Sequence, residues 1–206
     1  MKPTMKKVPV MLTTIALAGQ LTLPAVAATP LAPRSYEGSI NITEAFRDQK
    51  LQSWLLNAAN LGGAGADGVL TQEERMAVTQ LDLSGLGLTS LEGLGAFPNL
   101  QSLNCSNNNL EQLLLTDNTK LVFIETFDNR LTSIDVSMLP ELTFLHIDHN
   151  RLTHLDMSYN TKLEGGGFVA RNNFMEEIKL PNQPGLTVYL DDYEEQDPIE
   201  GHDRAA

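Results

Sequence analysis

Three consecutive segments of the chain repeat one pattern: LQSLNCSNNNLEQL at residues 100–113, LVFIETFDNRLTSI at residues 121–134 and LTFLHIDHNRLTHL at residues 142–155. Asn108, Asn129 and Asn150 lie 21 residues apart, and apolar residues recur at the same distances from each of them. The shared template is L-x-x-L-x-L-x-x-N-x-L-x-x-L. A fixed period of this length is typical of a protein whose units stack on one another.

Two further copies flank these three. The earlier copy begins at Val78 and has Leu86 in the asparagine position. The later copy begins near Phe168, has Asn173 in that position, and follows two extra residues within Glu164–Gly167. The sequence therefore predicts five repeats within residues 78–190, closed by a last strand at residues 186–190.

The template itself predicts the local structure. Alternation of the L-x-L type places two apolar side chains on the inner face of a short strand. An asparagine after the strand can turn the chain and satisfy backbone groups of the neighbouring unit with its amide. The second L-x-x-L then returns along the back. We expect an α/β solenoid: a right-handed parallel β-solenoid with extended or 3-10 back segments.

The segments LDLSGL at residues 81–86, LNCSNNNL at residues 103–110 and LTHLDMSYNT at residues 152–161 resemble the short leucine-rich repeats of bacterial secreted and cell-surface proteins, including the internalin-like class. The resemblance implies back segments without a full α-helix. It also implies recognition of a partner, usually a protein, on the concave face of the sheet.

Composition narrows the classes of function. The chain of 206 residues carries 26 acidic residues against 14 Lys and Arg, a net charge of −12. A surface this acidic does not suit the phosphate backbone, so we exclude nucleic acid as a partner. The single cysteine, Cys105, excludes an internal disulfide. Its repeat position is an inward one, equivalent to Ile147, so we expect it to be packed in the core.

The N-terminus carries the pattern of an export signal. Lysines within residues 1–7 precede an uncharged run from Val8 to Pro24 and the small residues of Ala25–Ala28. We predict a signal peptide at residues 1–27, cleaved after Ala27 or Ala28. The run is too short and too polar for a membrane anchor, which needs about 20 apolar residues. The protein is therefore expected to be secreted, periplasmic or on the cell surface, and not to span a membrane.

Both ends of the repeat array differ from the repeats. Residues 28–41 are expected to be a linker, and residues 42–77 a helical N-terminal cap, because a solenoid must cover its apolar ends. Apolar residues at helical spacing predict one amphipathic helix within residues 42–60, with Trp54 in the cap core. Residues 191–206 hold seven acids and are expected to be a disordered tail.

The cap contains a degenerate EF-hand-like loop. In similar repeat proteins a calcium loop often lies before the first strand, and Asp67 and Glu74 match two of its positions. Gly63 and Gly65 stand where the first two oxygen ligands would be, so these are weak metal candidates. The alternative is that Thr71 and Glu74 form a capping box at the start of a helix. We expect no cofactor, with calcium as the weaker alternative.

Strand residues that alternate with the buried leucines form columns across neighbouring repeats. Three phenylalanines fall in these columns and are surrounded by charged and histidine side chains, which is typical of a contact surface. The candidate partner-binding residues are Phe123, Glu125, Phe127, Asp128, Phe144, His146, Asp148, His149 and Arg171. The alternative is that the phenylalanines fold over a flank of the solenoid.

Chemical alternatives are weaker. A metal site at His146, Asp148 and His149, with Glu125, is disfavoured because His149 falls in the turn. A flat open ledge offers no pocket that could shift a pKa, so we expect no enzyme. The sequence thus predicts an exported, non-catalytic protein-interaction module. The alternative function is a glycan- or calcium-dependent cell-surface component or adhesin.

Overall fold

The computed structural model describes residues 8–9, 36–182 and 186–189. Their main sheet has seven strands in the order β1-β11-β9-β7-β6-β5-β4. The bounds are β1 Val8–Pro9, β4 Gln80–Asp82, β5 Ser102–Asn104, β6 Phe123–Glu125, β7 Phe144–His146, β9 Phe168–Val169 and β11 Thr187–Tyr189. The acidic tail predicted for residues 191–206 lies outside the described residues, as does the predicted signal peptide apart from β1.

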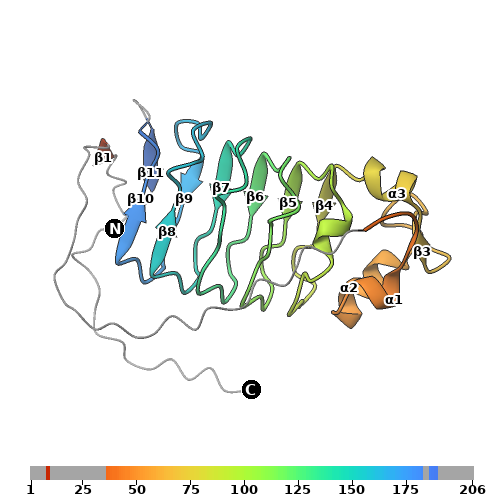
Figure 1. The fold of residues 1–206 in the computed structure, drawn as a ribbon. Coiled ribbons are helices and arrows are strands. Elements are labelled where there is room, and N and C mark those ends of the chain that lie inside the picture. The colour runs from red at the N-terminus through yellow and green to blue at the C-terminus, as the bar shows by residue number, and fades with distance from the viewer. Residues whose placement is uncertain (1–7, 10–35, 183–185, 190–206) are drawn as a thin grey trace, which may run out of the picture.

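Successive repeats contribute successive parallel strands. Leu81 pairs with Leu103, Leu103 with Ile124, and Ile124 with Leu145, so equivalent template positions stand side by side. The strands form a row in an elongated molecule, in which each repeat contacts its neighbours (Figure 1). This arrangement confirms the predicted parallel β-solenoid. At the far end of the row β1 pairs antiparallel with β11.

The repeated asparagines bind each coil to the one before it. The Asn129 amide donates hydrogen bonds to the carbonyls of Cys105 and Thr126, and its oxygen accepts one from the Leu110 amide at 3.0 Å. The equivalent bonds recur at the other three asparagines, Asn108, Asn150 and Asn173. All four side chains are buried, so polar groups inside the bend find partners without water.

The back segments are tight turns, as the sequence predicts. The first contains the 3-10 helix η1, Leu94–Ala96. In the next coil the amides of Asn118 and Leu121 bond to carbonyls three residues earlier. Asn118 and Asn160, both fully buried, also donate to two carbonyls each of the preceding coil. This second set of asparagine contacts, on alternate coils, is not part of the predicted template.

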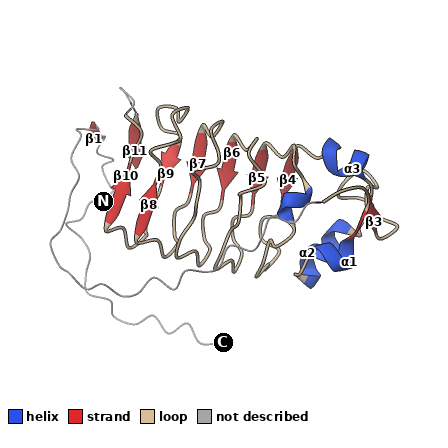
Figure 2. Ribbon diagram, viewed as in Figure 1, coloured by secondary structure: helices blue, strands red, loops and turns tan. Residues whose placement is uncertain are grey.

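A second, two-stranded parallel sheet lies on the flank of the last coils (Figure 2). It consists of β8 His154–Asp156 and β10 Glu177–Lys179. The repeat register explains the pairing, because both segments directly follow the asparagine turn in neighbouring coils. The sequence analysis assigned no strand to these positions.

The region before the repeats contains the hairpin of β2 Ile40–Asn41 and β3 Val69–Leu70, and the helices α1 Ile42–Ala45, α2 Gln49–Leu55 and α3 Gln72–Ala77. Ile40 and Asn41 therefore form a strand, although residues 28–41 were expected to be a linker. Every helix in the described part of the chain is too short or too polar to cross a membrane.

The prediction of one continuous helix within residues 42–60 is wrong. The chain leaves the helical conformation at Phe46, and α2 restarts at Asp48, which caps it through the amides of Lys50 and Leu51. The same carboxylate accepts hydrogen bonds from Thr89 and Ser90 of the first coil. Phe46 stacks on Phe97 with ring centroids 5.7 Å apart. These contacts with the solenoid explain the break.

Arg75 of α3 is buried and contacts no carboxylate among the described residues. Its guanidinium donates to the carbonyls of Ala96, Tyr36 and Gly38, at distances between 2.5 and 3.1 Å. Burial of an unpaired cation is costly unless hydrogen bonds replace its water. The side chain therefore joins α3, η1 and the segment before β2.

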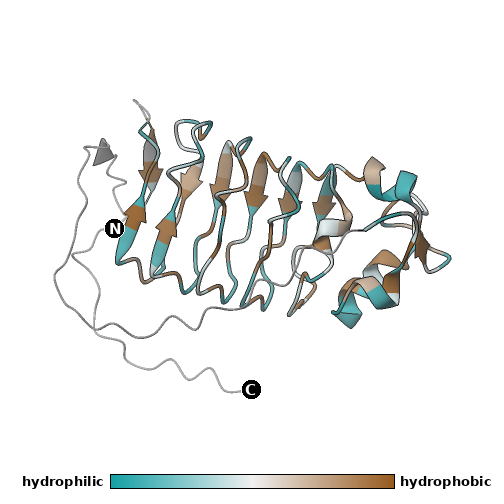
Figure 3. Cartoon of the chain, in the orientation of Figure 1, coloured by the Kyte–Doolittle hydropathy of each residue, from teal (hydrophilic) through white to brown (hydrophobic). Residues whose placement is uncertain are grey.

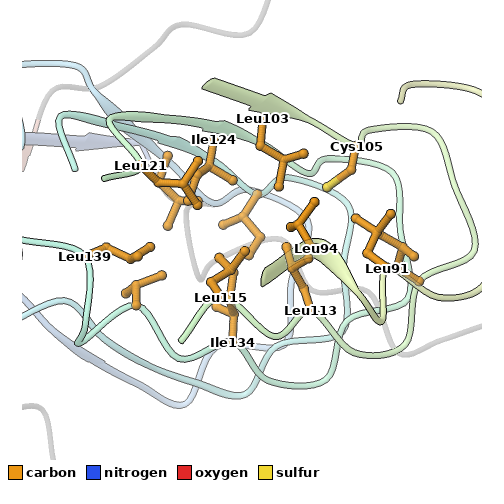
Figure 4. Close-up of a cluster of buried hydrophobic side chains, with 14 of the residues drawn as sticks. Leu91, Leu94, Leu103, Cys105, Leu113, Leu115, Leu121, Ile124, Ile134 and Leu139 are labelled. Carbon is orange, nitrogen blue, oxygen red and sulfur yellow. The ribbon is translucent and has the colours of Figure 1, made fainter. Parts of the chain in front are cut away.

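The core is one continuous cluster that runs the length of the solenoid. Hydrophobic residues recur at equivalent places in successive strands (Figure 3). Side chains from the strands, such as Leu103 and Ile124, point into the same interior as Leu115 and Ile134 (Figure 4). Cys105 is fully buried in this cluster, which confirms the inward position predicted for it.

Candidate functional site

The outward side chains of β4, β5, β6, β7 and β9 form a surface that we call the sheet face. Phe123 and Phe144 lie on it, directly opposite each other in the register of β6 and β7. Their rings are stacked nearly parallel, with centroids 4.4 Å apart and an interplanar angle of 6°. The inward neighbours Ile124 and Leu145 are fully buried, so the core does not require the phenylalanines.

Two more rings extend the stack toward the ends of the strands. The Phe127 ring lies 4.6 Å from the His146 ring, and the Phe144 ring meets His146 edge-on at 6.5 Å. Phe123, Phe144, Phe127 and His146 are all partly exposed. We call these four residues the aromatic cluster. It offers an apolar surface with polar groups at its edge, which suits contact with another molecule.

Asp148 differs from the exposed rim residue that the sequence suggests, because its side chain is only 5% exposed. One carboxylate oxygen, Oδ1, accepts a hydrogen bond from the Arg171 main-chain amide. The other, Oδ2, accepts from Arg171 Nε at 3.0 Å and Nη2 at 2.8 Å, and lies 3.2 Å from His146 Nε2. Asp148 thus holds both Arg171 and His146 in place beneath the sheet face.

Asp128 and His149 lie in the turns that follow the strands. Both have left-handed backbone conformations, with φ of 53° and 51°, and Asn107 and Asn172 share this conformation in their own coils. His149 Nδ1 lies 3.1 Å from Asp128 Oδ1, and its Nε2 lies 2.6 Å from the Asn172 amide. These side chains form a polar row beside the aromatic cluster.

The candidate metal ligands do not converge. No group of three or more His, Cys, Asp or Glu side chains in the described part of the chain could hold a metal ion. His146 and His149 pair with different carboxylates, those of Asp148 and Asp128.

The carboxylates of Asp67 and Glu74 take part in the local fold of their loop. Glu74 Oε2 accepts hydrogen bonds from the amide and hydroxyl of Thr71, which confirms the capping box at the start of α3. Asp67 Oδ1 accepts from the Val69 amide. With glycines at two ligand positions, these two carboxylates are already used by the local fold.

The residues predicted from the sequence therefore fall into three sets. The first set is the aromatic cluster, which the register of the strands brings together. Glu125 is the register partner of His146 on the neighbouring strand. The nearly buried Asp148 forms an ion pair with the partly exposed Arg171, and Asp128 and His149 form a pair in the turn. The ion pair between Asp148 and Arg171 was not predicted. It could have been, because the two residues occupy the same repeat position in successive coils and carry opposite charges.

The sequence matches no protein-family model and no curated protein. Among solved structures, the functional domain of InlJ from Listeria monocytogenes, which includes a cysteine ladder, is 26% identical with a TM-score of 0.55. That match covers 66% of this chain and 34% of InlJ. The internalin inlF of L. monocytogenes is 20% identical with a TM-score of 0.57, over 70% of this chain and 49% of that one.

The chain thus spans about a third to a half of the length of these two internalin chains. It has one cysteine where InlJ has a ladder. The likeness to inlF is one of fold. The protein is built as a parallel β-solenoid of about five turns and resembles the leucine-rich-repeat structures of internalins.

Proposed function

We propose that this protein is an exported, non-catalytic module that binds a protein partner through its sheet face. One observation carries the proposal: the aromatic cluster is partly exposed on a face whose inward residues already complete the core. Exposed aromatic groups with a polar rim are enriched where proteins bind each other. The likeness to internalin leucine-rich-repeat structures supports the same class of function.

The size of the face limits the partner. Five strands about 4.8 Å apart give a surface on the order of 25 Å long and about 12 Å wide, or roughly 300 Å². A standard interface takes about 800 Å² from each partner. We therefore expect the partner also to contact the polar row at Asp128 and His149.

The test compares two double variants. Phe123→Ser with Phe144→Ser removes the central stack, while Met138→Ser with Tyr159→Ser removes exposed apolar side chains, 54% and 66% exposed, from elsewhere on the same two coils. Cross-linking and mass spectrometry in the native envelope fraction should give a partner protein that the wild type and the Met138/Tyr159 variant capture and the phenylalanine variant loses. Equal capture by both variants would contradict the proposal.

Two further measurements test whether the ligand is a glycan and whether the protein is exported. Glycan-array binding that requires Phe123 and Phe144, without protein capture, would favour a carbohydrate ligand over a protein. Export is checked by mass spectrometry of the protein recovered outside the cytoplasm, which should begin after Ala27 or Ala28. Recovery of the intact chain in the cytoplasm alone would contradict the exported location.

A further inference from the structure

We propose that Arg171 receives a carboxylate of the bound partner, so that the sheet face selects a peptide segment with an acidic residue next to an aromatic one. This inference rests on the proposed function and adds the chemistry of the partner. Arg171 follows β9, and the aromatic cluster comes from the two coils before it. The carboxylate would bind Arg171 while the aromatic side chain packs on the cluster.

Asp148 fixes the orientation of Arg171. Two of the five N–H groups of the guanidinium, one on Nε and one on Nη2, point at Asp148 Oδ2. The Arg171 main-chain amide holds the second carboxylate oxygen, and the Asp148 side chain is nearly buried. The arginine is therefore held before any ligand arrives, which lowers the entropy cost of binding.

The opposite edge of the guanidinium is open. The Arg171 side chain is 43% exposed, and no other side chain in the described part of the chain bonds to it. An arginine edge with two parallel N–H groups matches a carboxylate in geometry and charge. The Nη1 side of Arg171 is thus available to a ligand while Asp148 occupies the Nε side.

The charged side chains along the sheet face should determine in which orientation the peptide segment binds. Glu125 on β6 and Arg171 after β9 lie on opposite sides of β7, two rungs or about 10 Å apart along the row of strands at roughly 4.8 Å per rung. An acidic group is repelled at Glu125 and attracted at Arg171, and His146 lies between them. The acidic residue of the segment should therefore point toward the later coils.

The test uses a library of random peptides displayed on phage, selected against the immobilised mature protein. Wild-type protein should enrich peptides with Asp or Glu near an aromatic residue. Arg171→Lys keeps a cation beside Asp148 and so preserves the fold, but it removes the two-pronged edge. Selection on this variant should keep the aromatic preference and lose the acidic one.

A synthetic peptide with the enriched sequence is then used to measure how much Arg171 contributes to the binding affinity. Its affinity should fall about 10- to 100-fold with Arg171→Lys or Arg171→Gln, in line with the loss of charge-assisted hydrogen bonds. Arg130→Gln is the matched control, because Arg130 is exposed two coils before Arg171 and bonds to no carboxylate among the described residues. It should change the affinity less than about twofold.

The outcomes distinguish the two proposals. If wild type and the Phe123/Phe144 variant enrich the same peptides, the proposed function fails. Aromatic peptides without an acidic preference, or an affinity unchanged by Arg171→Lys, would overturn the role of Arg171 and leave the binding face intact. Enrichment of basic peptides would overturn it as well, since their charge would place them at Glu125.

Discussion

At the scale of single residues, burial decides the chemistry of Cys105. Burial raises the pKa of its thiol to about 12, and a hydrogen bond with the Thr126 side chain offsets only part of that effect. The nucleophilic thiolate is therefore almost absent near neutral pH. The side chain therefore behaves as a small apolar core residue.

We predict that iodoacetamide at pH 8 leaves the native protein unmodified and labels Cys105 fully in denaturant. The reason is that neither the thiolate nor a route for the reagent exists in the folded state. Mass spectrometry after labelling gives the measurement, and glutathione in the same tube controls for reagent activity. Labelling of native protein at the rate of glutathione would contradict the buried position.

Asp48 is the residue that most directly links stability to pH. Burial raises the pKa of its carboxyl, but hydrogen bonds from the Thr89 amide and hydroxyl and from the amides of Leu51 and Lys50 outweigh burial and hold the pKa below its usual value of 3.8. Because the folded pKa is the lower one, this stabilisation is fully present above the unfolded value. It is lost as the pH falls through the folded value.

Replacement of Asp48 by Asn should therefore lower the free energy of unfolding at pH 7 by about 1–3 kcal/mol, because the Asn amide keeps one acceptor oxygen for the α2 cap but loses the charge and the second oxygen that accepts from Thr89 and Ser90. The difference from wild type should shrink as the pH falls below about 4. Urea unfolding at a series of pH values measures both effects. Asp117→Asn, at an exposed position, is the control, and a difference independent of pH would contradict the prediction.

At the scale of elements, the asparagine turns connect one coil to the next. Each buried amide satisfies an amide and a carbonyl of the preceding coil and at least one carbonyl of its own. A strand of only two or three residues makes few backbone hydrogen bonds with the next strand. The asparagine side chains therefore supply many of the hydrogen bonds between neighbouring coils. Removal of one asparagine side chain leaves a buried backbone amide without a partner, while the carbonyls keep a bond from the neighbouring asparagine.

Asn129→Ala should lower the free energy of unfolding by about 1–3 kcal/mol, since it leaves the Leu110 amide unpaired in the interior and removes one of the two donors to each of the Cys105 and Thr126 carbonyls. Asn109→Ala is the matched control, because Asn109 is partly exposed and has no hydrogen bond from its side chain in the described structure; its change should stay within about 0.5 kcal/mol. Urea unfolding followed by circular dichroism measures both. Equal effects would refute the role of the buried amide.

At the scale of the whole molecule, each coil is stabilised by its contacts with the adjacent coils. The hydrophobic core runs without interruption from Ile42 to Val188, and the N-terminal helices join the first coil through Asp48, Phe46 and Arg75. Repeat proteins with strong contacts between units unfold as one when the array is short. The helical end and the central coils should therefore unfold together.

Trp54, the single tryptophan, reports on the helical end because it packs against the core from α2. We predict that Asn129→Ala, three coils away, shifts the Trp54 fluorescence midpoint in urea as far as it shifts the circular dichroism midpoint. Asn109→Ala should shift neither. A fluorescence midpoint that stays at the wild-type value would mean that the two regions unfold separately.

The repeats and the capping box of Thr71 and Glu74 could be predicted in detail, but the break between α1 and α2 could not. Period and template identified the strands at Leu103, Ile124 and Leu145, because every rung repeats the same local requirement. The helix break at Asp48 was missed, since its cause is a bond to Thr89 on a coil 41 residues later. On the sheet face, the columns placed Phe123 beside Phe144 correctly, while burial of Asp148 depended on where the Arg171 side chain turned.

The sequence by itself determined the period, the inward and outward faces and the turn asparagines, because these follow from backbone alternation and from what each coil must bury. Only the tertiary structure decided which outward groups meet: the aromatic cluster, the Asp148–Arg171 pair and the β8–β10 flank. The physical reason is that these contacts join side chains from different coils. Their rotamers depend on neighbours one or more repeats away, which no local pattern encodes.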